Sequence, residues 1–215
     1  MPGNWGDRER GIVSSGPQLR ALAVADAPGR WAALGFALTG AAVALGGVTV
    51  QLGAPGRGIV GWALSGIDIA ADLDGLATTL AAPSPAPDPV AHPNGAVGLD
   101  HVIVLTPDFE RTAAALEAAG MPLRRIRRIE AGDFRQGFRR LGPGILELVE
   151  AHDAPPGPAH FWGLVVIVSD LEALAERLGD RLRAIKPAVQ PGRRIATLRR
   201  EAGLSVAVAF MDPEL

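Results

Sequence analysis

The residues from 98 to 212 contain the same succession of predicted segments twice. In the first copy, the apolar run of "DHVIVLT" predicts a strand, and "PDFERTAAALEAAG" predicts a helix with Pro107 and Asp108 near its start and Gly120 at its end. Two strands follow, "RQGFRRL" and "ILELVE", joined by a tight turn at 142–144. The second copy repeats this order as "GLVVIVS", "DLEALAERLG", "RRIATLRR" and "LSVAVAF". We interpret this order as a βαβββ unit that occurs twice, with three of its four strands legible in each copy, which predicts an α+β fold of two equivalent modules.

Residues 18–80 carry a weaker version of the same pattern. The segment "LRALAVADAPGRWAALGF" predicts a strand, a turn and a helix, and "AAVALGGVTVQL" predicts a hairpin that turns at Gly46-Gly47. Residues 45–52 align without gaps on 141–148, which places Gln51 where Glu147 lies. "GIVGWALSG" and "DLDGLATTLA" then predict a further strand and helix. We therefore expect a degenerate, shortened βαβββ-βα module, packed against residues 98–212.

Two other stretches delimit these modules. Residues 81–97 contain five prolines between positions 83 and 93, which predicts an extended, semi-rigid linker. Residues 1–17 have mixed charge and lack the apolar core of a signal peptide, so we expect a loose tail.

Composition narrows the classes of function. The sequence contains no cysteine, which excludes disulfides, zinc-thiolate sites and cysteine nucleophiles and favours a cytoplasmic protein. A net charge of −2 favours neither a nucleic acid nor an anionic membrane as partner. Residues 31–50 are uncharged and long enough for a transmembrane helix, but Gly46-Gly47 favours a hairpin there. Lys186 is the single lysine beside many arginines, a bias typical of a GC-rich bacterial genome.

Four segments resemble the vicinal oxygen chelate superfamily, the glyoxalase- and bleomycin-resistance-like proteins. They are "LDHVIVLTPDFERT", "QGFRRLGPGILELVE", "GLVVIVSDLEALAERL" and "PGRRIATLRR". The resemblance covers residues 98–212 well and 18–80 as a degenerate echo. It implies that two βαβββ modules curl into a half-open barrel around a cavity. It also implies a divalent metal there, which is held by His and Glu from the first and last strands of each module and stabilises an enolate or similar oxyanion.

The resemblance carries two metal-ligand positions onto this sequence, His101 and Glu147. In the second module the matching strand start is Gly163, and the last strand offers alanines at 207 and 209. Two protein ligands are fewer than the three that catalytic zinc usually has. We therefore expect either an incomplete site for Zn, Mn, Ni or Fe, or no metal. Because Gly163 has no side chain, we also expect a larger cavity at that point.

Each of these two residues has a second interpretation. His101 shares a strand face with Ile103 and Leu105, so it is either a cavity residue or a hydrogen-bonded core imidazole. Glu147 is either a ligand or base, or the partner of Arg139 or Arg140 across the tight turn.

Arginines and one tryptophan complete the predicted site. The run from 124 to 140 is rich in arginine, which is typical of a solvated basic edge strand. Guanidinium groups also suit carboxylate or phosphate oxygens, so Arg139, Arg193 and Arg199 are candidates to bind an anionic substrate. Trp162 precedes the second module and either packs at the cavity rim or stacks on the substrate.

Two functions remain open for a small oxygenated, anionic ligand. The first is a glyoxalase-like lyase or isomerase, or a dioxygenase-related enzyme, in which His101 and Glu147 act as ligands or as an acid–base pair. The second is a metal-free small-molecule binder of the antibiotic-sequestering kind. A purely structural role would require a cavity filled by side chains. The protein is expected to be a monomer or a homodimer.

Overall fold

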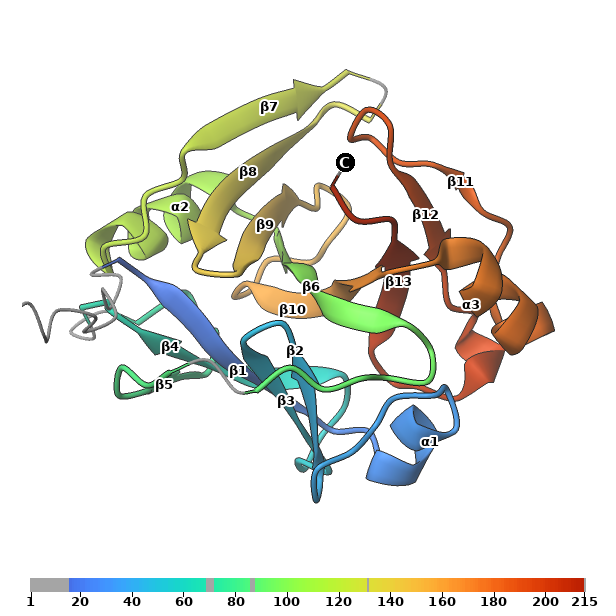
Figure 1. Ribbon diagram of the computed structural model, residues 1–215. Helices are drawn as coiled ribbons and strands as arrows, with labels where there is room; N and C mark the ends of the chain where they lie inside the picture. The colour runs from blue at the N-terminus through green and yellow to red at the C-terminus, as the bar shows by residue number, and fades with distance from the viewer. Residues whose placement is uncertain (1–15, 69–71, 86–87, 131, 215) are drawn as a thin grey trace, which may run out of the picture.

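The structure is a computed structural model that describes residues 16–68, 72–85, 88–130 and 132–214. It contains an eight-stranded sheet of order β11-β12-β13-β10-β6-β9-β8-β7 and a five-stranded sheet of order β2-β3-β1-β4-β5. Figure 1 shows the two ends of the larger sheet, β7–β8 and β11–β12, on either side of its central strands β6 and β10. The smaller sheet lies beneath β6 and β10, on the outer face.

The larger sheet is built from two βαβββ modules. The first strand of each module pairs parallel with its last strand, β6 with β9 and β10 with β13, and the modules join through antiparallel β6 and β10. This confirms the predicted α+β fold of tandem βαβββ modules in a half-open barrel. The first module comprises β6 (Ala96–Thr106), α2 (Phe109–Ala118), β7 (Arg125–Ile129), β8 (Phe134–Leu141) and β9 (Gly144–Glu150). The second comprises β10 (His160–Val168), α3 (Leu171–Leu178), β11 (Lys186–Pro187), β12 (Arg194–Thr197) and β13 (Ala207–Met211), with short 3-10 helices at Gly179–Arg181 and Arg200–Ala202.

The two module helices begin within two residues of the predicted starts, directly after Asp108 and Asp170. The Asp108 carboxylate accepts a hydrogen bond from the Arg111 N–H at 3.0 Å, and Asp170 accepts one from the Ala173 N–H at 2.9 Å. Each aspartate thus satisfies an N–H that has no partner within its helix.

The smaller sheet is a shortened version of the same unit. Its elements are β1 (Gln18–Val24), α1 (Pro28–Ala32), β2 (Ala42–Leu45), β3 (Val48–Leu52), β4 (Ile59–Ser65) and β5 (Thr78–Leu80). The predicted hairpin is confirmed: β2 and β3 are antiparallel, and Gly46 and Gly47 both have positive φ, at 55° and 96°. β1 pairs parallel with β3 and antiparallel with β4, as β6 does with β9 and β10.

The helix predicted in "DLDGLATTLA" is wrong. Asp74 and Gly75 have positive φ and form a turn, and the residues that follow pair with β4 as the parallel strand β5. The hydroxyl of Thr78 accepts a hydrogen bond from the Trp62 indole N–H at 2.7 Å. The β-branched Thr78-Thr79 pair suits a strand better than a helix, and the indole bond holds it to β4. Residues 69–71 lie outside the described part of the chain.

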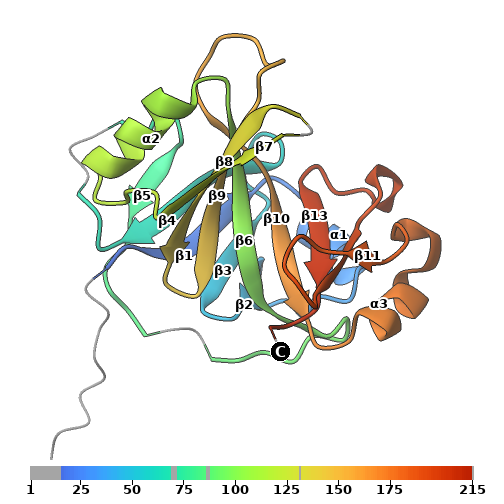
Figure 2. The same ribbon diagram turned by 90° about the horizontal axis from the view of Figure 1, so that it is seen from above.

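Side chains from both sheets form one hydrophobic core between them. Trp62 of β4 contacts Phe161 of β10 edge-on, and Phe36 stacks on Phe210 of β13 with ring centroids 6.2 Å apart. Figure 2 shows the strands of the larger sheet crossing above β1, β2 and β3. The smaller sheet therefore covers the outer face of the half-barrel and leaves the interior face free.

The interior face carries a separate, smaller apolar cluster. It centres on Ile103, Val165, Ala209 and Met211, and partly buried side chains pack against it: Leu105, Val149, Ala188 and Ile195. The strand face that His101 shares with Ile103 therefore points into the half-barrel.

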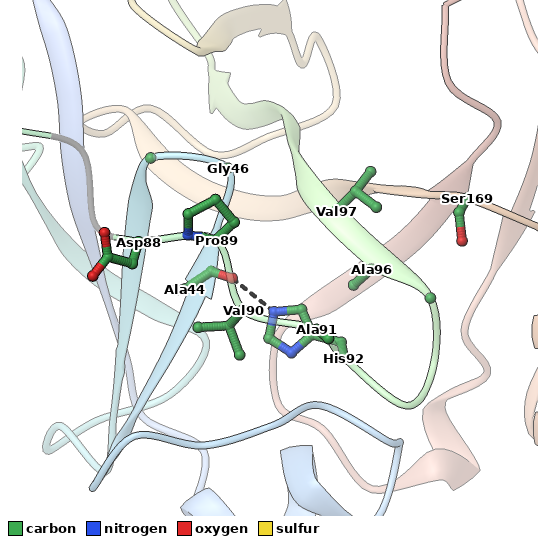
Figure 3. Close-up of a pocket in the computed structure, with 12 residues that line it drawn as sticks. Ala44, Gly46, Asp88, Pro89, Val90, Ala91, His92, Ala96, Val97 and Ser169 are labelled. Atoms are coloured by element: carbon green, nitrogen blue, oxygen red, sulfur yellow. Dashed lines mark hydrogen bonds between the residues drawn. The ribbon is translucent and has the colours of Figure 1, made fainter.

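The described end of the proline-rich linker is anchored to the smaller sheet. The Nδ1 atom of His92 accepts a hydrogen bond from the Ala37 N–H at 3.0 Å, and its Nε2–H donates to the Ala44 carbonyl at 2.7 Å (Figure 3). The amide of Asn94 donates to the Leu34 carbonyl at 3.1 Å. Residues 92–94 are therefore fixed against the N-terminal module, and 86–87 lie outside the described part of the chain.

Across the described ranges, no helix is long and apolar enough to cross a membrane. The uncharged segment 31–50 forms the end of α1, β2 and β3.

Candidate functional site

A cavity of about 260 Å³ lies on the interior face of the half-barrel. His101 of β6 and Glu147 of β9 form part of its wall, and Lys186 reaches it from β11 at the opposite edge of the sheet. The lining residues are His101, Arg127, Gln136, Phe138, Glu147, Lys186, Pro187, Ala188, Val189, Gln190, Ile195, Thr197 and Met211. Both modules therefore contribute to the wall, and the cavity is not filled by side chains.

A β-bulge in β6 places two consecutive polar side chains together. His101 pairs with Val165 of β10, but the next pair is Leu99 with Val166, so Asp100 is an extra residue on its strand. Neighbouring residues in a regular strand point to opposite faces, and a bulge re-aims one of them. As a result, the Asp100 carboxylate lies 2.7 Å from His101 Nδ1.

The other ring nitrogen of His101 faces Glu147. The distance from Nε2 to the Glu147 carboxylate is 3.1 Å, and the two side chains are 10% and 13% exposed. Gln136 of β8 fixes the second carboxylate oxygen by donating a hydrogen bond from its amide nitrogen at 2.9 Å. Glu147 lies across from Phe138, so the cross-strand Arg–Glu pair considered from the sequence is not formed.

Arginines occupy both ends of this chain of contacts. At one end, the Nε–H of Arg127 donates to the Gln136 side-chain oxygen at 2.7 Å, and the guanidinium lies 5.1 Å from the centre of the Phe138 ring. At the other end, the Arg193 guanidinium forms an ion pair with Asp100 at 2.7 Å. A continuous polar network thus runs across the interior face, in the order Arg127, Gln136, Glu147, His101, Asp100 and Arg193.

The charges in this network stabilise a protonated histidine. Burial on its own lowers the pKa of His101, but the hydrogen bonds and negative charges of Asp100 and Glu147 outweigh burial and raise the pKa to about 9. Burial also opposes ionisation of Asp100, yet the hydrogen bonds and charges of His101 and Arg193 hold the pKa of its carboxyl below the ordinary value. The two carboxylates therefore favour the protonated form of His101.

Three residues predicted to bind substrate do not line this cavity. Arg139 lies across from Leu146, whose side chain is in the core on the outer face, and its guanidinium points toward the Pro122 carbonyl at 3.5 Å. Arg199 is exposed and follows β12. Trp162 is 50% exposed and is the extra residue of a bulge in β10. Their placement differs from the sequence prediction because strand register and bulges decide which face a side chain takes.

The fourth predicted substrate-binding residue, Arg193, is 7% exposed and lines a neighbouring cavity of about 160 Å³. Asp100 and Gln190 line this smaller cavity as well, and Gln190 is shared with the cavity beside His101. Arg193 therefore contacts the site through Asp100.

Gly163 does not enlarge the cavity, contrary to the sequence prediction. A Cβ atom at this position would lie 2.5 Å from the Ala207 carbonyl oxygen and 2.9 Å from the Ala207 Cβ. β10 and β13 approach each other so closely here that the space of a side chain is already taken. Glycine is therefore a packing requirement at this position.

The donor groups do not fit the metal site that the resemblance implies. The described residues include no group of three or more His, Cys, Asp or Glu side chains arranged to hold a metal ion. Both ring nitrogens of His101 are hydrogen-bonded, and the second module places Gly163 and alanines at the matching positions. The Zn, Mn, Ni or Fe ion considered from the sequence stays a prediction, and no chemical step is derived through it.

Sequence reasoning missed Asp100, Gln136 and Arg127. The signal for Asp100 was present, because two consecutive polar residues in "LDHVIV" interrupt the alternation of a regular strand and indicate a bulge. Gln136 and Arg127 gave no such signal, since their roles depend on the register of β7 and β8.

A larger cavity, of about 620 Å³, lies on the other side of the molecule between the β2–β3 turn and residues 88–97 (Figure 3). Its polar side chains do not converge: His92 is turned toward Ala44, and Asp88 and Ser169 lie at opposite ends of the view. Both ring nitrogens of His92 are engaged by the protein backbone. This cavity offers no chemistry comparable to that around His101.

No protein-family model and no curated protein matches the sequence. Among solved structures, methylmalonyl-CoA epimerase from Mycobacterium tuberculosis is similar, with 21% identity and a TM-score of 0.47 over 56% of this chain and 91% of that chain. A variant of the Streptomyces coelicolor methylmalonyl-CoA epimerase, in complex with 2-nitronate-propionyl-CoA, has 18% identity and a TM-score of 0.45 over 54% and 97%.

The order and direction of the strands decide the fold assignment: two βαβββ modules, joined through their first strands, form one curved sheet. The chain has the vicinal oxygen chelate fold. A hypothetical protein from Bacillus halodurans is similar as well, with 15% identity and a TM-score of 0.45 over 54% of this chain and 94% of that chain. These likenesses concern the fold and carry no argument about the reaction.

Proposed function

We propose that this vicinal oxygen chelate chain binds a small, oxygen-rich anion in the half-barrel cavity without a metal ion. The observation that carries the proposal is the charge of the cavity wall. Three lining side chains are cationic, those of His101, Arg127 and Lys186, and one carboxylate, Glu147, is present among the described lining residues. Positive groups around a partly enclosed space favour an anionic ligand.

The placement of the cations supports a ligand with several oxygens. Arg127 lies on β7 and Lys186 on β11, the two edge strands of the larger sheet, and His101 lies on the central strand β6. A carboxylate bound between the edges would contact a guanidinium that can bind it in a bidentate manner and an ammonium that acts as a point charge. The volume of about 260 Å³ suits a small metabolite.

Titration of the protein with oxalate, pyruvate and inorganic phosphate, followed by isothermal calorimetry, tests this proposal. We expect a dissociation constant below about 1 mM for at least one of these probes. Arg127→Gln and Lys186→Gln should each weaken binding by about tenfold, as expected for one lost charge-assisted contact. The matched control is Arg183→Gln, an exposed cation that does not line the cavity. Equal affinity in all four proteins would refute the assignment.

A second candidate function is proton transfer next to a carbonyl group, as a lyase or isomerase requires. It is favoured by the position of Glu147, whose carboxylate borders the cavity 3.1 Å from an imidazolium N–H. In this function Glu147 takes a proton from the bound molecule, and the His101 imidazolium stabilises the negative charge that develops on oxygen. No residue of the second module is needed for the proton transfer itself.

Exchange of the pyruvate methyl protons in deuterium oxide, followed by NMR, separates binding from catalysis. The enzymatic function predicts exchange that depends on protein and is lost in Glu147→Gln. Binding of pyruvate with no exchange above the buffer rate would support the sequestering function instead.

A further inference from the structure

Arg193 does not line the cavity, yet it contacts two elements that do. Its guanidinium Nη2 is 2.7 Å from Asp100, and both side chains are nearly buried, at 7% and 8% exposed. Its main chain closes the loop between β11 and β12: the N–H of Ala188 donates to the Arg193 carbonyl at 2.9 Å, and the Arg193 N–H donates to the Gln190 carbonyl at 3.2 Å. This loop carries Gln190 to the cavity wall, and it follows β11, the strand on which Lys186 reaches the same cavity.

Asp100 connects Arg193 to the imidazole. One carboxylate oxygen contacts His101 Nδ1 and the other contacts Arg193, so the carboxylate is held at both ends. The Nδ1–H bond to Asp100 fixes the ring, which leaves Nε2 directed at Glu147 and the cavity. The Arg193 Nε–H donates to the Asp212 carbonyl at 2.8 Å, which anchors the guanidinium at the end of β13.

From this geometry we infer that Arg193 is the positioning residue of the cavity. It holds Asp100 so that the His101 ring keeps its orientation, and its side-chain bonds to Asp100 and to the Asp212 carbonyl fix the β11–β12 loop next to the cavity. Through its ion pair with Asp100, Arg193 thus connects the second module to the polar network at His101, from a position other than 163, 207 and 209. The predicted effect of Arg193 on ligand affinity rests on the proposed function, whereas its predicted effect on the orientation of the His101 ring does not.

The ring orientation can be tested by NMR of the histidine side chains. The wild-type protein should show a slowly exchanging Nδ1–H resonance from His101, because this proton is buried and hydrogen-bonded to Asp100. The His101→Gln variant assigns the signal by removing it. We expect Arg193→Gln and Asp100→Asn to lose or shift this resonance, and Arg183→Gln, at an exposed position, to keep it. A wild-type resonance in Arg193→Gln would overturn the inference.

Arg193→Lys keeps the test decisive if Arg193→Gln fails to fold. A lysine ammonium retains the charge but not the planar fork that reaches Asp100 and the Asp212 carbonyl together. We therefore expect Arg193→Lys to remain folded and still to shift the His101 resonance. A folded Arg193→Lys protein with an unchanged resonance would overturn the positioning role.

Oxalate affinity provides the second measurement. In calorimetric titrations, Arg193→Lys should bind oxalate about tenfold more weakly than wild type, as expected when one charge-assisted contact in the site is misplaced. Unchanged affinity would contradict the inference. If wild-type protein binds no oxalate while the His101 resonance still responds to Arg193, the proposed function fails for this probe and the positioning role stands.

Discussion

The two modules of the half-barrel share one topology but differ in what they place on the interior face. The first module supplies His101 and Glu147 from its first and last strands, with Asp100 brought beside them by a bulge. The second module has Gly163 on its first strand, packed so tightly against Ala207 that no side chain fits. Its cationic groups at the site are instead Lys186, on the edge strand β11, and Arg193, in the loop that follows β11. Equivalent backbones therefore do not require equivalent sites, since strand starts and loops can change separately.

The buried charges of the first module provide the strongest test of this difference. Asp100→Ala removes the carboxylate that lies between His101 and Arg193 and leaves two buried cations without it. We expect the free energy of unfolding to fall by about 3–5 kcal/mol, as when one partner of a buried ion pair is lost. Urea denaturation measures this change, with the exposed Asp153→Ala as control. A loss below about 1 kcal/mol, the level of a surface ion pair, would show that the network is not truly buried.

The raised pKa of His101 predicts a pH dependence of stability. Because the folded-state pKa of about 9 lies above the ordinary value of 6.5 for histidine, protonation stabilises the folded protein, and the full contribution is present below about pH 6.5. It is lost as the pH rises through 9, with an upper bound of roughly 3 kcal/mol for one such group. Urea denaturation between pH 6 and 10 measures this slope. The His101→Gln variant should lose the slope, and an identical slope in this variant would assign it to other groups.

Gly163→Ala tests the packing requirement in the second module. The new Cβ would lie 2.5 Å from the Ala207 carbonyl oxygen, so β10 and β13 must separate. We expect a loss of about 1–3 kcal/mol in thermal or urea unfolding, typical of overpacking in a core. Gly29→Ala is the control, since nothing lies within 4 Å of its added Cβ. If Gly163→Ala is as stable as wild type, packing does not explain why position 163 lacks a metal-ligating side chain.

The smallest expected effect concerns the helix starts, which the two modules share. Asp108→Ala and Asp170→Ala each remove one side-chain hydrogen bond to a helix N–H. We expect each to cost about 1 kcal/mol in urea unfolding. A much larger loss at one aspartate would indicate that the two helices are not equivalent in the fold.

The sequence predicted features that depend on local patterns. The period of apolar residues, the Pro-Asp helix start and the Gly46-Gly47 turn are each set within a few residues, and the structure bears them out. The prediction of a second helix in the N-terminal copy was wrong. The turn at Asp74-Gly75 and the hydrogen bond from Trp62 to Thr78 favour a strand, against the weak repeat that indicated a helix. Long-range pairing is not readable from local pattern alone.

Only part of the site was predicted, because its remaining contacts also depend on long-range strand pairing. His101 and Glu147 could be found because the repeat places them at defined points of the first and last strands. The contacts of Asp100, Gln136 and Arg193 depend on a bulge, on the register of β8 and on the closure of the β11–β12 loop. The sequence analysis assigned Arg139 to the cavity, but the register of β8 and β9 turns its side chain to the opposite face. A shift of one residue in register is enough to change the face.

The central claim is that the half-barrel binds an oxygen-rich anion through its own cationic side chains. Calorimetric titration of the wild-type protein with oxalate, first in excess EDTA and then with added Mn²⁺ or Zn²⁺, tests it most directly. The account predicts saturable binding in EDTA with a dissociation constant below about 1 mM, unchanged within a factor of about two by either metal. Binding that appears only after a divalent metal is added would contradict it.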